Sequence, residues 1–143
     1  MDSQLPTDRF VVGEHSAQFE PPDIVHLRPR GDVSVEDTLK LIKFVRTLPR
    51  PPKGFFGLVD IAHAKRQDPA VWNMPESQEF MKSYRAQVFY NATFYHRTLI
   101  GIFSRVGKLL PGGANLTPIM IFSTEAESRA WIAKHRGEST KGT

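Results

Sequence analysis

One segment brings an acid and a histidine close together: residues 53–67, KGFFGLVDIAHAKRQ. Asp60 ends an apolar run, and His63 follows three residues later. Such a pair could perform general acid–base chemistry if both side chains converged on one substrate, at the strand end where open α/β sheets place ligands. The alternative is that the Asp60 carboxylate accepts hydrogen bonds from nearby backbone N–H groups and caps the turn. We favour the capping role, because no second acid or nucleophile lies at a sequence spacing that would indicate a catalytic site.

Two further groups of residues are candidates for binding. His63, Lys65 and Arg66 could hold an anion, although most short basic runs are solvated turns. Trp72 and Met74 lie in an apolar segment interrupted by Pro75, which could cover a pocket or form a dimer contact. The complete set of candidate ligand-binding or partner-binding residues is Asp60, His63, Lys65, Trp72, Met74 and Arg97.

Motifs for catalysis, metals and cofactors are missing from the sequence. It has no cysteine, which excludes a thiolate nucleophile and a zinc site built on sulfur. The five histidines do not show the HxH, HxxxH or HExxH spacing of metal sites. A P-loop and a Gly-x-Ser-x-Gly nucleophile motif are also absent. We therefore expect no catalytic residue, no metal and no cofactor.

Charge and hydropathy limit the partners. The net charge is +4, but the basic residues are spread along the chain, so we do not expect nucleic acid binding. No apolar run approaches the about 20 residues that span a bilayer, and the first residues do not form a signal peptide. We expect a cytoplasmic protein.

The periodicity of apolar residues predicts one α/β domain over residues 9–136, with flexible termini at 1–8 and 137–143. The expected strands are 9–20, 24–31, 54–61, 86–94 and 117–123, and the expected helices are 34–48, two short ones within 68–84, 95–110 and 124–136. The first two strands should form an antiparallel hairpin. The nearly continuous apolar run at 54–61 is typical of a strand covered on both faces. The order ββαβαβαβα predicts a mixed five-stranded sheet covered by helices.

Local signals mark where several helices begin. Ser34 precedes Asp37 by three residues, and Thr124 precedes Glu127 by three, as in capping boxes. Pro75 is expected to divide the helical segment 68–84 in two.

Four motifs in this order resemble those of SpoIIAA-like proteins, a branch of the STAS and CRAL-TRIO-like α/β folds: GDVSVEDTLKLI, GLVDI, AQVFYNATFYHRTLIGIF and FSTEAESRAWI. The resemblance covers residues 9–135. It implies a small bacterial domain similar to anti-sigma factor antagonists, which bind other proteins and are switched by phosphorylation of a Ser after the central strand. The matching segment here, DIAHAKRQDPAVW, contains neither Ser nor Thr.

The resemblance and the missing motifs favour a non-catalytic regulatory or protein-interaction domain that binds a partner protein or forms a homodimer. A carrier of a small apolar ligand or lipid, held in a pocket beside the central strand, is the alternative. An enzyme that uses Asp60 and His63 ranks third.

Overall fold

A computed structural model describes residues 9–68, 70–92 and 118–141, without the side chains of residues 66, 67, 72, 73 and 137–141. Its elements are β1 (Phe10–Val12), β2 (His15–Glu20), β3 (Ile24–Arg28), β4 (Gly31–Val33), α1 (Val35–Arg46), β5 (Phe55–Asp60), β6 (Ala64–Gln67), α2 (Ala70–Asn73), α3 (Pro75–Met81), β7 (Tyr84–Tyr90), β8 (Ile119–Ile121) and α5 (Glu125–Lys141). The predicted helix 95–110 and the candidate Arg97 lie outside the described residues.

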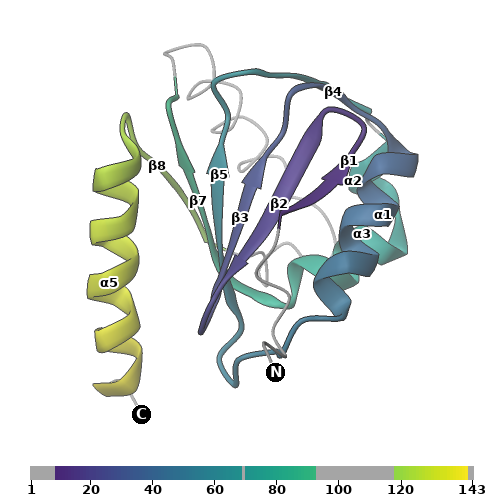
Figure 1. Ribbon diagram of the computed structural model, residues 1–143. Coiled ribbons are helices and arrows are strands. Elements are labelled where there is room, and N and C mark those ends of the chain that lie inside the picture. Colours follow the sequence, from purple (N-terminus) through teal and green to yellow (C-terminus); the bar gives the residue numbers. More distant parts are fainter. Residues whose placement is uncertain (1–8, 69, 93–117, 142–143) are drawn as a thin grey trace.

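The main sheet is mixed and has the strand order β1-β2-β3-β5-β7-β8. Strands β1, β2 and β3 pair antiparallel, whereas β3, β5, β7 and β8 pair parallel. Helix α5 covers one face of this sheet, and α1, α2 and α3 lie on the other (Figure 1). The predicted α/β fold class and the antiparallel pairing of β2 with β3 are confirmed.

The sheet has six strands where the sequence predicted five, because residues 9–20 form two strands. Gly13 has a φ of 59°, a left-handed conformation that allows a tight turn, so the chain reverses there. Val12 consequently pairs with His15. A second sheet of two strands, β4 and β6, was also not predicted; it pairs Gly31 with Ala64.

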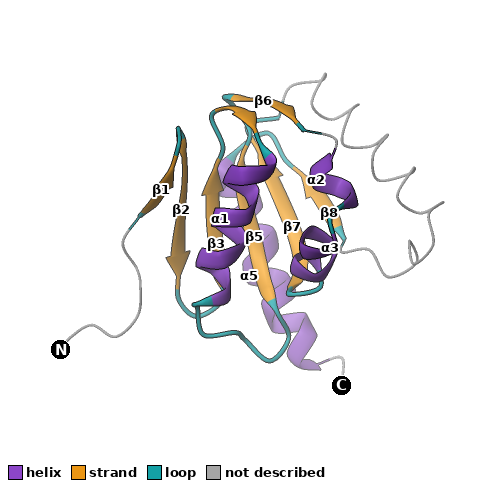
Figure 2. Ribbon diagram, turned by 90° about the vertical axis from the view of Figure 1, so that its right-hand side faces the viewer, coloured by secondary structure: helices purple, strands orange, loops and turns teal. Residues whose placement is uncertain are grey.

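Strand β5 forms the centre of the molecule, between β3 and β7 (Figure 2). Residues 55–59 of this strand are all buried, as predicted for a strand covered on both faces. On the α5 side, Phe56 and Leu58 pack with Ile132. On the α1 side, Phe55 packs in a second apolar cluster with Val45. The sheet therefore separates two hydrophobic cores.

The predicted helix starts are present. The Ser34 hydroxyl accepts a hydrogen bond from the backbone N–H of Asp37 at 3.0 Å. The hydroxyl of Thr124 accepts one from the backbone N–H of Glu127 at 3.2 Å, and the Glu127 carboxylate accepts the N–H of Thr124 in return. Pro75 opens α3 and separates it from α2. Helix α5 continues past residue 136 to Lys141.

Gly54, directly before β5, is required by both its conformation and its surroundings. Its φ is +90°, and a Cβ atom would lie 2.8 Å from the Ser83 carbonyl oxygen and 3.1 Å from the backbone nitrogen of Arg85. Gly31 also has a positive φ, +75°, but its nearest neighbour would be a Glu14 carboxylate oxygen at 4.0 Å. Of these two glycines, Gly54 alone combines backbone strain with a steric clash.

We expect Gly54→Ala to lower the free energy of unfolding by about 2–4 kcal/mol, from left-handed strain plus overpacking. Gly31→Ala is the matched control and should cost about 1–2 kcal/mol, from the strain alone. Urea unfolding of both variants measures the difference. Equal losses would show that close approach to the start of β7 is not what requires Gly54.

Candidate functional site

Asp60 lies at the end of β5, as the sequence predicted, and its carboxylate is already bonded. The Oδ1 atom accepts hydrogen bonds from the backbone N–H of Ala62 and from the side-chain amide of Asn91, both at 3.0 Å. Asn91 follows β7 and has a left-handed φ of 61°. Asp60 thus joins the ends of two parallel strands and closes the turn after β5, which is the capping contact.

Within the described part of the chain, none of the remaining candidates is hydrogen-bonded to Asp60. The side chains of His63 and Lys65 are exposed, and no hydrogen bond joins His63 to Asp60 among the described residues. The backbone carbonyl of His63 accepts the N–H of Gly31, which fixes β6 beside β4. Met74 is half-buried at the start of α3. The side chain of Trp72, like Arg97, lies outside the described part of the chain.

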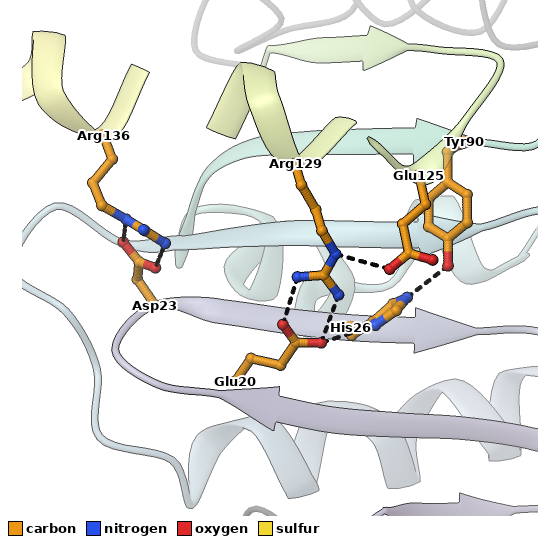
Figure 3. A network of polar contacts seen from close by, with 7 residues as sticks. All are labelled: Glu20, Asp23, His26, Tyr90, Glu125, Arg129 and Arg136. Carbon is orange, nitrogen blue, oxygen red and sulfur yellow. Dashed lines mark hydrogen bonds and ion pairs between the residues drawn. The ribbon is translucent and has the colours of Figure 1, made fainter. Parts of the chain in front are cut away.

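A polar cluster of described residues joins α5 to the β2–β3 hairpin (Figure 3). The guanidinium of Arg129 donates two hydrogen bonds to the Glu20 carboxylate, at 2.8 and 2.9 Å, and a third to Glu125 at 2.8 Å. Two turns further along α5, Arg136 makes a second bidentate contact with Asp23. Parallel N–H···O pairs of this kind fix orientation as well as distance. They fasten α5 to both sides of the hairpin turn.

A buried histidine continues this network into the core. His26 of β3 lies with Nδ1 3.0 Å from a Glu20 oxygen and Nε2 2.7 Å from the Tyr90 hydroxyl. Because an ionised carboxylate can only accept hydrogen bonds, Nδ1 carries the proton and donates a hydrogen bond to Glu20. Neutral His26 therefore accepts the Tyr90 O–H at Nε2. The chain of donors runs from Tyr90 through His26 to Glu20.

The environment holds each of these groups in one protonation state. The hydrogen bonds from Arg129 lower the pKa of Glu20 and raise the pKa of Arg129 itself. Burial, assisted by the charge of Arg28, lowers the pKa of His26. Burial and the nearby carboxylates raise the pKa of Tyr90 to about 12. At neutral pH the network thus consists of a carboxylate, a neutral imidazole and a protonated phenol.

A carboxylate, an imidazole and a hydroxyl in series have the composition of a proton relay. His26 and Tyr90, however, are each only 2% exposed, so a substrate could not reach either ring in this conformation. Among the described residues, no group of three or more His, Asp or Glu side chains is placed to hold a metal ion. The arrangement can therefore cross-link the structure, but its imidazole and phenol are not presented to solvent.

The sequence did not identify this network, because its members are far apart along the chain. Arg129 and Glu20 are separated by 109 residues, and His26 and Tyr90 by 64. One signal was available: Arg129 and Arg136 are seven residues apart and so lie on one side of the final helix. Their carboxylate partners had no comparable pattern.

We expect Arg129→Ala to lower the free energy of unfolding by about 1–2 kcal/mol, since Glu20 would keep its charge but lose its main partner. Arg129→Lys should lose part of this amount, because an ammonium group cannot make the paired contact. Lys134→Ala, at an exposed position of the same helix, is the matched control. Urea unfolding compares the three variants; a loss no larger than that of the control would contradict a role for Arg129 in docking α5.

The lowered pKa values of His26 and Glu20 give a pH dependence of defined sign. Below the ordinary pKa of each group, the unfolded chain binds protons that the folded chain does not. The free energy of unfolding therefore decreases as the pH decreases. The His26 contribution should be lost as the pH falls from 6.5 through its lowered folded value, and the Glu20 contribution as the pH falls from 4.5 through its own.

The measurement is the free energy of unfolding across this range for the wild-type protein and for His26→Gln. The difference between the two curves should shrink toward acid, beginning near pH 6.5. A difference that stays constant with pH, or grows as the pH falls, would be inconsistent with the buried neutral imidazole.

The comparisons with known proteins find similarity among solved structures. The sequence matches no family model and no curated protein. Its structure is similar to that of an uncharacterized protein of the DUF3478 family, with a SpoIIAA-like fold, from Shewanella loihica PV-4. The TM-score is 0.58, the identity is 14%, and the alignment covers 92% of this chain and 98% of the other. None of the described helices is long and apolar enough to cross a membrane. The chain therefore has a SpoIIAA-like fold, as the sequence motifs predicted.

Proposed function

We propose that this chain is a non-catalytic interaction domain that pairs with a second copy of itself through strand β1. The observation that carries the proposal is the exposure of this strand. β1 is an edge strand of the main sheet, and Val11 at its centre is 61% exposed. Open edges with apolar side chains are templates for strand addition by another chain.

Packing contacts hold β1 in place at the edge of the sheet. The ring of Phe10 stacks on Phe44 of α1, with centroids 4.6 Å apart and the planes at 4°. Val12 is buried, whereas Val11 points to the opposite side of the strand, beside Ser16. Helix α5 contacts β5 and β7 and meets β2 at its last residue, Glu20, whereas it lies away from β1 (Figure 1). A partner strand would therefore meet a rigid edge with an accessible apolar side chain.

The non-catalytic part of the proposal is supported by the hydrogen bonding of Asp60 and by the burial of His26 and Tyr90. Asp60 already accepts two hydrogen bonds, and His26 and Tyr90 are sealed in the core. Each of these residues, which could otherwise support acid–base chemistry, holds structural elements together.

A regulatory role by partner binding agrees with the SpoIIAA-like fold. In anti-sigma factor antagonists, which this fold resembles, a phosphorylated Ser follows the central strand. Residues 61–73, between β5 and the end of α2, contain neither Ser nor Thr. The association that we propose therefore does not depend on phosphorylation at this position.

Sedimentation velocity over a range of protein concentrations tests the proposal. The wild-type protein should form a dimer as the concentration rises. Val11→Lys should remain monomeric with unchanged stability, because a charge on an edge strand blocks pairing. Leu39→Lys is the matched control: Leu39 is 39% exposed on α1, outside β1, and its substitution should leave the dimer intact. A wild-type protein that stays monomeric at the highest concentration would refute self-association.

A further inference from the structure

A hollow of about 160 Å³ lies between the ends of α1 and α3, over the first residue of β5. It is at the opposite end of β5 from Asp60, and none of the candidate residues from the sequence lines it. Both helices lie on the same face of the sheet (Figure 2). The hollow is distinct from the β1 edge that the proposed dimer uses.

The floor of the hollow is apolar. Val45, Leu48 and Phe55, which are 2–6% exposed, form it together with the half-buried ring of Phe80. An apolar cavity of about 150 Å³ can bind benzene, so this hollow fits a ring or a short aliphatic chain. It is smaller than the about 300–1,000 Å³ of typical drug-sized ligand pockets, which favours a small molecule over a long lipid chain.

The rim of the hollow is cationic. Arg46 and Arg50 both line it and are exposed, and Glu79 is the one acid among the lining residues. Glu79 forms an exposed ion pair with the Lys82 ammonium, at 3.9 Å. A cation in the last turn of a helix, such as Arg46, is explained by the helix dipole. Arg50 lies four residues beyond α1, and the dipole does not account for it.

Two groups at or beside this site have hydrogen-bonding capacity that the described contacts leave unused. Arg50 donates a long contact of 3.4 Å to the Lys82 carbonyl, which leaves most of its N–H groups for other partners. Directly behind the floor, Tyr84 packs on both Phe55 and Phe80, and its buried hydroxyl has no hydrogen-bond partner among the described residues. Guanidinium groups beside an apolar floor match a molecule with a carboxylate and a small apolar body.

We infer that this hollow is a binding site for a small carboxylate with an apolar body about the size of a benzene ring. The apolar part enters between Leu48 and Phe80, and the carboxylate pairs with Arg46 and Arg50 at the rim. The inference concerns a ligand and not the dimer, so either can fail without the other.

Sodium benzoate is the probe, and the amide NMR signals of the full-length protein are the readout. Benzoate should produce saturable shifts at Leu48, Phe55 and Ser83, with a dissociation constant of about a millimolar. Benzyl alcohol, a neutral molecule with the same ring, should bind several-fold more weakly. Arg46→Gln and Arg50→Gln should each weaken benzoate binding about threefold or more and leave benzyl alcohol binding unchanged.

Lys40→Gln, an exposed cation elsewhere on α1, is the control for a general charge effect and should change neither affinity. The inference is overturned if benzoate causes no saturable shift at the residues of the hollow at tens of millimolar. It is also overturned if benzoate and benzyl alcohol bind equally well, since the arginines would then not recognise the carboxylate.

Discussion

Burial of strand β5 on both faces is the constraint on which the rest of the structure depends. Its neighbours β3 and β7 satisfy its backbone hydrogen bonds within the sheet, so its apolar side chains need a covering layer above and below. The central strand is covered closely even at Gly57, which has no side chain. A Cβ atom on Gly57 would lie 2.4 Å from the Gln87 side-chain oxygen, so the amide of Gln87 occupies the space over the central strand.

The cover on the α5 side comes from a helix with few apolar residues. Ile132 is fully buried, and Trp131 packs edge-on against Phe56 with ring centroids 6.3 Å apart. So small an apolar contact would leave the helix free to rotate or slide. Arg129 and Arg136 prevent such movement, because they lie two helical turns apart and each binds a different carboxylate at the β2–β3 turn. Arg129 binds Glu20, and Arg136 binds Asp23. Apolar burial and the arginine pairs both stabilise the contact, and the arginine pairs also fix its geometry.

The parts of the fold that the sequence predicted are those with local signals. The N-cap at Ser34, the capping box at Thr124 and the break at Pro75 depend on residues within four positions of one another, and each is present in the structure. The division of residues 9–20 was missed because an isolated Gly13 is compatible with either a bulge or a hairpin turn, and only pairing across the sheet decides between them. The polar network was missed for the same reason: Glu20 and Arg129 meet only after the whole sheet has formed.

The directions of the pKa shifts show what the buried network is suited to do. Acid–base catalysis needs groups whose pKa values lie near the working pH, so that a proton can be taken up and released. Here the pKa of Glu20 is lowered, and that of Tyr90 is raised to about 12, so both move away from neutrality. The pKa of His26 is also lowered, which keeps the imidazole neutral between them. Each shift strengthens the protonation state that the hydrogen bonds require, and the chain from Tyr90 to Glu20 is therefore better suited to holding β2, β3, β7 and α5 in register than to transferring a proton.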